Sequence, residues 1–340
     1  MIDQTPWFVS SPNAQHSSEV ARVMAYAGTG GKEGISAPGD LKVTAQSVPN
    51  GTVRVAPGGG VMLSRYAGGT SQSYVGRNAT TTNVAIAPTT SAGKRSDLVV
   101  LRVLDPAFEG QPPSDPTNFD YTRLTVIQGV AANTTDAAKL NLSYPAIALA
   151  RIDIPASTGA ITQAMIKDVR RVANPREESH VIARPSVMGD QGLTLTSKSA
   201  YPDGEWMPNF GGDSNNGVHT LHVPSWATQL EIRAEWLGVR YNNKAGYGYY
   251  WVTFGPDATS ANPSGKTQAF SWDADESASI YRSNWILHDQ NGIPASWRGT
   301  DINFVLRANR RNTNAQAGTV SLDGLSGITL SVRFLETSDD

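Results

Sequence analysis

The chain has 340 residues, of which 39% are apolar and 17% charged, and its net charge is −2. This length predicts two domains with enough apolar material for real cores. The near-neutral balance gives no electrostatic reason to expect a nucleic-acid partner. Since the chain has no cysteine, disulfides, thiolate nucleophiles and Cys-based zinc sites are excluded. No apolar run approaches the roughly 18 residues of a membrane span, so we expect no membrane insertion.

One short helix is predicted near the start of the chain, in "SSEVARVMAYAGTGG". Ser17 or Ser18 can cap its first turn, and Gly28 ends it. The apolar positions recur at helical spacing and share one face: Val20, Val23, Met24 and Ala27.

From there to residue 172 the pattern favours strands. "LKVTA", the Asn50-Gly51 turn before "TVRV", "DLVVLRVL" and "TRLTVIQG" are all typical of β-structure. "PAIALARIDIP" alternates so that one predicted face carries Ala146, Ala148, Ala150, Ile152 and Ile154. Small residues on that face predict that something packs closely against the strand. We therefore expect residues 1–172 to form a β-rich domain with one short helix.

Residues 173–200 are polar, contain Pro175 and Pro185, and show no sustained periodicity. That composition predicts a linker or an extended crossing segment.

Residues 201–340 differ in composition and pattern, because seven of the eight tryptophans fall there. "QLEIRAEW", "INFVLRA" and "ITLSVRF" each alternate apolar and polar positions, and the segments between strands are rich in Gly, Asn and Asp. Strands with one polar face predict an antiparallel β-sandwich of the jelly-roll kind. The fold class expected for the whole chain is mainly β.

No catalytic, metal or cofactor site is predicted. His219 and His222 are three residues apart, so in a strand they point to opposite faces and cannot share a metal. "WDADES" gathers Asp273, Asp275 and Glu276, and paired carboxylates can hydrolyse glycosides when held about 5 to 9 Å apart. Alternate acids of this kind more often lie in solvent, and we expect no enzyme.

Aromatic residues concentrate in "WLGVRYNNKAGYGYYW" (236–251) beside asparagines and glycines. Rings next to polar side chains are typical of sugar-binding grooves, because a pyranose presents C–H patches and hydroxyls together. The alternative is that half of these rings fill the sandwich core. The candidate ligand-binding residues are Tyr241, Asn242, Tyr247, Tyr249, Trp251, Trp272 and Asp273.

Residues 20–172 resemble the N-terminal region of minor tail and baseplate proteins of long-tailed phages, especially those that infect actinobacteria. The resemblance rests on the order of "RSDLVV", "IQG", "LARIDIPAST" and "IKDVR". It implies that Arg95 and Asp97 mark where a strand leaves a loop at a subunit contact. Asp168 and Arg170 would have the same role at the end of the domain. For Arg95, a local interpretation as a hairpin charge in solvent remains open.

The resemblance implies a virion structural protein, made in the host cytoplasm and built into the tail. Its N-terminal domain would dock onto other tail proteins, and the sandwich would bind a host-surface glycan as a receptor-binding module. We expect a homotrimer, because tail tips commonly use closed symmetry. The alternatives are a tail-borne glycan depolymerase, which would need converging carboxylates, and a purely architectural protein.

Overall fold

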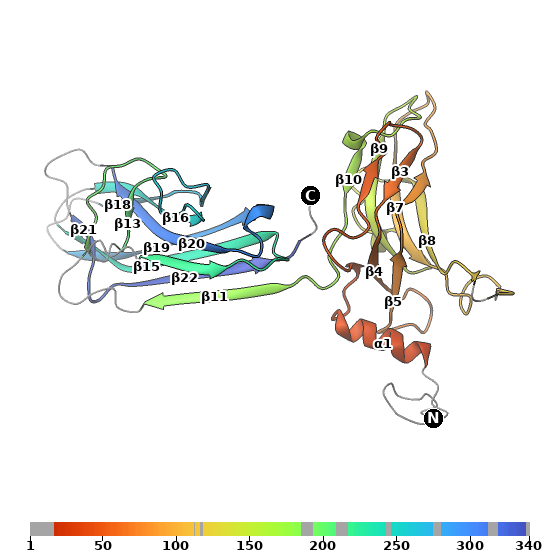
Figure 1. The fold of residues 1–340 in the computed structure, drawn as a ribbon, viewed down its shortest axis with the longest axis horizontal. Helices are drawn as coiled ribbons and strands as arrows, with labels where there is room; N and C mark the ends of the chain where they lie inside the picture. Colours follow the sequence, from red (N-terminus) through yellow and green to blue (C-terminus); the bar gives the residue numbers. More distant parts are fainter. Residues whose placement is uncertain are drawn as a thin grey trace. The chain divides into compact units, whose positions relative to one another are not determined.

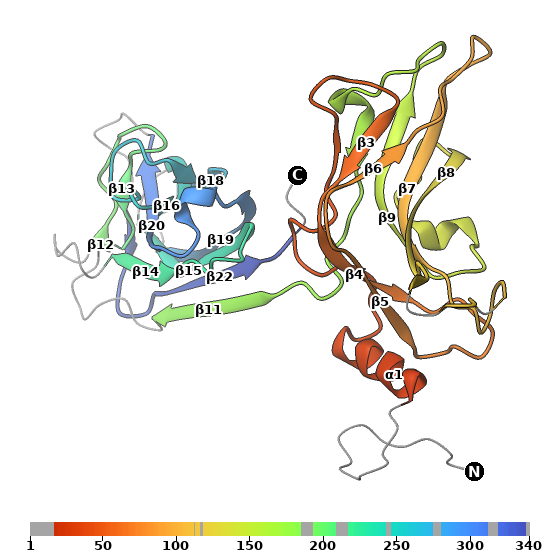
Figure 2. The ribbon, with the colours of Figure 1, turned by 45° about the vertical axis from the view of Figure 1, so that its right-hand side comes forward.

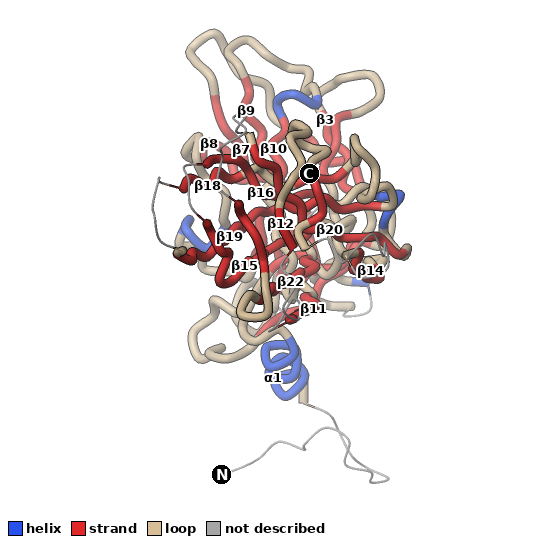
Figure 3. The backbone as a smooth tube through the Cα atoms, turned by 90° about the vertical axis from the view of Figure 1, so that its left-hand side faces the viewer, coloured by secondary structure: helices blue, strands red, loops and turns tan. Residues whose placement is uncertain are grey.

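The computed structural model describes residues 17–111, 113–115, 118–184, 193–208, 217–242, 246–274, 280–311 and 319–337. The protein is mainly β, as expected, and strands dominate the backbone trace in Figure 3. It forms two compact units: unit 1 comprises Met1–Pro175 with Thr337–Asp340, and unit 2 comprises Arg176–Glu336. Both are seen in Figure 1. Among the described residues, no helix has the length and apolarity to cross a membrane.

Helix α1 (Ser18–Gly28) forms where the sequence predicts it, and Ser17 Oγ caps it by accepting from Glu19 N at 3.1 Å. Its apolar face is exposed: Val23 is 46% and Met24 41% accessible. The helix is attached through Arg22, which donates to Gln72 Oε1 at 2.6 Å and lies over the Tyr74 ring. The helix is therefore held mainly by polar contacts.

Unit 1 contains three antiparallel sheets around one core. The first has the order β10-β9-β7-β8, with β7 Arg95–Val103, β8 Thr122–Val130, β9 Ala146–Ile154 and β10 Ile166–Asp168. The second has the order β2-β3-β6, with β2 Val43–Ala45, β3 Thr52–Val55 and β6 Thr82–Ala85. The third has the order β1-β4-β5, with β1 Gly34–Ile35, β4 Gly58–Leu63 and β5 Ser73–Asn78. Two 3-10 turns, η2 (Ala137–Leu140) and η3 (Gln163–Met165), lie between strands.

The alternation expected along β9 is broken by a bulge. Val99 pairs with Ala150 and Val100 with Ala148, which leaves Leu149 without a partner position. Such an extra residue shifts the face of everything after it. Ala146 and Ala148 therefore pack in the small cluster that includes Ala137 of η2, whereas Ala150 packs in the main core. The close neighbour of the small residues is thus the chain's own 3-10 turn.

Unit 2 is a two-sheet sandwich whose sheets share one core. One sheet has the order β11-β22-β15-β19, with β11 Glu177–Arg184, β15 Gln229–Asn242, β19 Tyr281–Gly292 and β22 Gly327–Leu335. The other has the order β14-β20-β16-β18, with β14 Val218–His222, β16 Gly246–Gly255, β18 Phe270–Ala274 and β20 Asp301–Arg310. Short strands extend these sheets: β12 Leu193–Thr194, β13 Glu205–Trp206, β17 Gly265–Lys266 and β21 Thr319–Leu322, and the 3-10 turn η4 spans Ala295–Trp297.

The strand order of the eight longer strands is that of a jelly roll. Successive strands cross from one sheet to the other, except β16 and β18, which are neighbours in the same sheet. This is the two-sheet, eight-strand arrangement in which the chain folds back as interlocking Greek keys. The predicted sandwich is confirmed.

The expected linker over residues 173–200 is wrong for most of its first half. Glu177 to Arg184 form β11, which pairs with β22 over eight successive residues and is the first strand of the jelly roll. Its side chains are exposed or half-buried because it lies at the edge of the sheet, and that is why the segment lacks an apolar pattern. Farther along, Leu195 is fully buried in the core. Residues 185–192 lie outside the described residues.

This boundary predicts that a fragment spanning residues 176–336 folds cooperatively, whereas residues 201–340 are much less stable. The shorter fragment lacks Ile182 and Leu195, which pack in the core, and burial of such side chains contributes about 1.5–3 kcal/mol each. Urea melts of the two fragments provide the measurement. Equal midpoints would contradict the assignment of β11 to the sandwich.

Candidate functional site

Two of the predicted ligand-binding residues lie exposed on one face of the jelly roll. Tyr247 is 49% and Tyr249 36% accessible, and both belong to β16. Residues two apart in a strand point to the same side and are about 6.6 Å apart. Their rings therefore form a pair on the outer face of the sheet that contains β16 and β18.

Polar side chains flank this pair on the neighbouring strand. In the β16–β18 register, Asp273 is opposite Tyr247 and Ser271 is opposite Tyr249, and both are exposed. We call Tyr247, Tyr249, Ser271 and Asp273 the tyrosine strip. It combines two aromatic rings with a carboxylate and a hydroxyl, and Ser271 is a member that sequence analysis missed. Ser271 belongs to the strip because β18 pairs with β16. The register of such a pair cannot be deduced from the pattern of a single strand.

Gly248, between the two tyrosines, explains why their rings face outward. A Cβ there would lie 2.0 Å from the Asn309 carbonyl oxygen and 2.7 Å from Trp272 Nε1. Position 248 therefore has room for no side chain on the inner face, where Trp272 packs over it. This close packing accounts for the glycine between the two tyrosines.

Two other predicted ligand residues, Tyr241 and Trp272, are buried and belong to the core. Trp272 stacks on Trp285 with ring centroids 5.7 Å apart, and Tyr241 stacks on Tyr281 at 4.9 Å. Trp285 Nε1 donates to Tyr241 Oη at 2.6 Å, and burial raises the pKa of Tyr241. Buried rings with satisfied polar atoms are structural, so the prediction of ligand contact is wrong for Tyr241 and Trp272.

Trp251 is also wrong as a ligand residue, for a different reason. Its ring points to the outer side of the sheet, as the alternation predicts, but it is fully buried. Tyr201 packs edge-on against it at 5.4 Å, and its Nε1 donates to the Pro202 carbonyl at 3.2 Å. The segment before β13 thus covers this part of the outer face.

Asn242 ends β15 and is half-buried, and it is not one of the paired positions around the two tyrosines. Asp275 and Glu276 lie outside the described residues, so of the three carboxylates in "WDADES" only Asp273 is placed. Within the described ranges, no group of three or more His, Asp or Glu side chains is arranged to hold a metal ion.

The two neighbouring histidines behave as the strand geometry predicts. His219 is buried in β14, whereas His222 is exposed and contacts Asp301 Oδ1 at 2.8 Å. Burial lowers the pKa of His219, and the Arg184 guanidinium adds to the effect.

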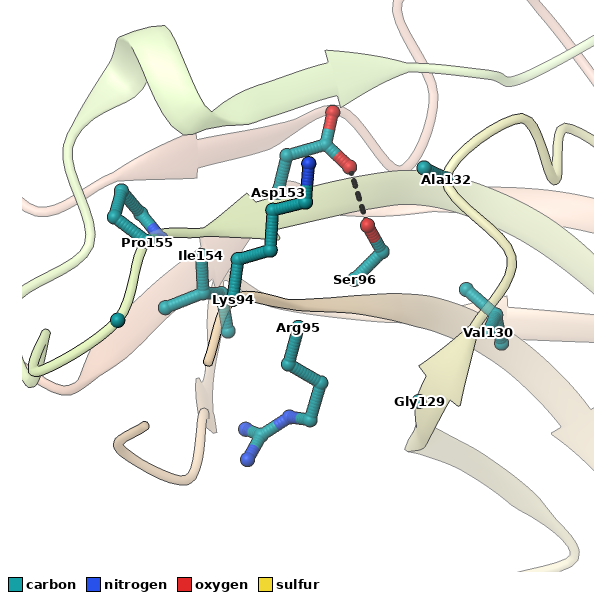
Figure 4. Close-up of a pocket in the computed structure, with 10 residues that line it drawn as sticks. Lys94, Arg95, Ser96, Gly129, Val130, Ala132, Asp153, Ile154 and Pro155 are labelled. Carbon is teal, nitrogen blue, oxygen red and sulfur yellow. Dashed lines mark hydrogen bonds between the residues drawn. The ribbon is translucent and has the colours of Figure 1, made fainter. Parts of the chain in front are cut away.

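A hollow of about 770 Å³ lies in unit 1, where β7 begins and β8 and β9 end (Figure 4). Lys94 and Arg95 point to opposite sides of the strand there. Ser96 Oγ donates to Asp153 Oδ1 at 2.8 Å, and the paired Arg151 holds the pKa of the Asp153 carboxyl below its usual range. The remaining wall is apolar: Val130, Ala132, Ile154, Pro155 and Ala156.

Next to this hollow, Arg95 and Asp97 form an internal clamp. Asp97 is fully buried and accepts hydrogen bonds from Arg95 Nε at 2.7 Å and Arg95 Nη2 at 2.8 Å. It also accepts Gly129 N at 3.1 Å, where the register of β7 and β8 shifts. Arg95 in turn donates to the carbonyls of Ala87 and Pro88. These charges hold loops of the same chain, so neither a solvent hairpin nor a subunit contact is needed to explain them.

The hollow therefore offers little for recognition. Its Arg95, Ser96 and Asp153 side chains already have partners within the chain, and the described residues of its lining include no aromatic ring. The tyrosine strip is the better candidate for ligand contact.

Comparison with known proteins gives no family assignment. No family model matches the sequence, and no curated protein matches it. Among solved structures, infectious bursal disease virus of the Gx strain is similar at 9% identity and a TM-score of 0.26, over 88% of this chain and 74% of that one. The VP2 subviral particle of the same virus is similar at 10% identity and a TM-score of 0.24, over 92% of this chain and 81% of that one. Folds with such TM-scores do not superpose as wholes, so these likenesses assign neither family nor function.

The clamp predicts that Asp97→Ala destabilises unit 1 by about 3 kcal/mol, because it leaves a guanidinium and a buried N–H without their acceptor. Arg233→Ala is the matched control. It removes an equally spaced pair with Glu235 on a strand, but the Arg233 side chain is 60% exposed, so no measurable change is expected. Thermal unfolding of both variants tests this, and equal losses would contradict the clamp.

His219 predicts a loss of stability in acid. Its folded pKa lies below the ordinary value of 6.5, so the unfolded chain binds more protons as the pH falls. The stability is present above about pH 6.5 and is lost as the pH drops through the lower folded pKa. In His219→Leu, the melting temperature should fall less between about pH 7.5 and pH 5 than in wild type. His222→Leu is the exposed control, and an identical acid response in wild type and His219→Leu would contradict the prediction.

Proposed function

We propose that the protein is a virion structural component whose unit 2 binds a host-surface glycan through the tyrosine strip. The observation that carries this is the exposure of Tyr247 and Tyr249 side by side on a rigid strand. Exposed rings on a jelly roll can stack on the C–H face of a sugar, while Asp273 and Ser271 accept or donate hydrogen bonds to its hydroxyls. The jelly roll is an architecture used by both viral capsid and lectin domains.

The place in the virion is likewise a proposal, and it rests on the ordered motifs of residues 95–170. Unit 1 would dock onto other tail proteins, and unit 2 would be presented to the host. Docking of this kind requires a stable scaffold, and the clamped loops of unit 1 supply one.

A homotrimer remains part of the proposal. The small residues of β9 give it no support, because Ala146 and Ala148 pack with η2 of the same chain and Ala150 packs in the main core. Support now comes from the exposed Val23 and Met24 of α1, which leave an apolar stripe uncovered in the monomer. Light scattering measures the assembly, and a mass near 36.3 kDa at micromolar concentration would contradict it.

Tyr247→Ala and Tyr249→Ala should each weaken glycan binding about three- to tenfold per site, the factor expected from the loss of one stacked ring. A multivalent assembly would lose more. Because both rings are exposed, the free energy of unfolding should change by less than about 0.5 kcal/mol. The measurement is binding of the labelled full-length protein to arrayed actinobacterial cell-wall glycans.

Tyr121→Ala is the matched control, since Tyr121 is 38% exposed but lies in unit 1. Wild-type binding by the Tyr247→Ala/Tyr249→Ala double variant would favour the architectural alternative. Release of sugar fragments from the array by the wild-type protein would favour the depolymerase.

A further inference from the structure

Strand β8 has one edge that no described strand pairs with. It is the outermost strand of the sheet β10-β9-β7-β8 and, among the residues that the structure describes, pairs only with β7. An edge strand presents a row of main-chain N–H and C=O groups that can pair with another strand. At nine residues, β8 is long for an edge strand of a small sheet.

A second edge strand, β6, borders the same space. Within the described part of the chain it pairs only with β3 (Figure 2). The groove between β6 and β8 has a volume of about 690 Å³. Its lining consists of β6, the first half of β8, and the side chains of Arg77, Asn78, Leu101 and Asp120. Five residues of β8 contribute to the lining, which corresponds to about 17 Å of extended chain.

The groove has an apolar floor and a basic rim. Leu124 and Val126 are half-buried against the core and line the groove together with the buried Val84. Arg77 is exposed and forms no ion pair with any residue that the structure describes. Arg123 lies over the Phe119 ring and donates to the Asp120 carbonyl at 3.0 Å. The groove lining thus carries two guanidinium groups and one exposed carboxylate, that of Asp120.

We propose that this groove binds an extended acidic segment of a partner protein by strand addition. The partner's main chain would pair with the open edge of β8, and its alternate apolar side chains would cover Leu124 and Val126. A carboxylate of the partner would pair with Arg77, because a guanidinium group can donate two parallel hydrogen bonds to a carboxylate. Main-chain pairing supplies affinity in this mode, and the side-chain contacts set specificity. The proposal is independent of glycan binding, because it concerns the other unit.

The test uses the full-length chain and a fluorescein-labelled octapeptide, Asp-Thr-Val-Thr-Val-Thr-Val-Asp. We expect saturable binding by fluorescence anisotropy, with slower amide exchange in Thr122–Val130. Two probes of the same sequence, N-methylated at alternate residues along one edge or the other, separate strand pairing from side-chain contact. The probe that loses the N–H groups facing β8 should lose binding, whereas the other should retain more of it.

The role of charge is tested with Arg77→Glu. This variant should bind the acidic probe about tenfold more weakly and should bind a probe with lysine at both ends more tightly than wild type does. Arg54→Glu is the matched control: Arg54 is exposed on β3 but does not line the groove, and binding should be unchanged. Equal effects of the two variants on probe binding would contradict the proposal that the partner segment is acidic.

Other outcomes also overturn the proposal. Full binding by both N-methylated probes would exclude strand addition. No saturable binding of the acidic or the lysine probe up to about 1 mM would exclude a peptide groove. Sedimentation as an oligomer that loses probe binding as chain concentration rises would identify the occupant as a second copy.

Discussion

The structure depends on arginine side chains that satisfy main-chain carbonyl groups of its long connections. A buried carbonyl without a donor costs as much as a lost hydrogen bond. In unit 1, Arg95 donates to Ala87 and Pro88, and Arg170 donates to Pro38 and Asp40. Each guanidinium is held in place by a carboxylate two residues away along the chain.

Unit 2 uses the same device in its outer face. Arg307 is 2% exposed and donates to the carbonyls of Ala258 at 2.9 Å and Ser260 at 2.8 Å, as well as to that of Asp203. Burial lowers the pKa of Arg307, yet a guanidinium remains charged at any ordinary pH. The covering of Trp251 therefore depends on one side chain that fixes two loops at once.

Much of this fold could be predicted, because strands with one buried face show alternating apolar and polar residues in the sequence. The jelly-roll strands β15, β20 and β22 have that pattern, and α1 has its cap and its terminal glycine. Edge strands do not: β11 lacks a buried face, and its pairing with β22 joins residues about 150 positions apart. The bulge at Leu149 is equally invisible, since one extra residue leaves the composition unchanged.

The candidate site shows the same limit. Exposure of Tyr247 and Tyr249 follows from local alternation with Gly246 and Gly248. The burial of Trp251 does not, because the ring that covers it comes from Tyr201, far away in sequence. Aromatic density by itself therefore predicts a core better than it predicts a ligand surface.

The pairing of β11 with β22 has a mechanical consequence. Residue 176 connects unit 2 to unit 1, and Arg176 is tied to Glu336 through Nε at 3.0 Å and Nη2 at 2.5 Å. Tension that enters along β11 is aligned with the strand, so it loads the hydrogen bonds to β22 in shear, all together, and does not open them one at a time. Unit 2 would therefore resist a pull along its first strand better than a force that peels β11 away from one end.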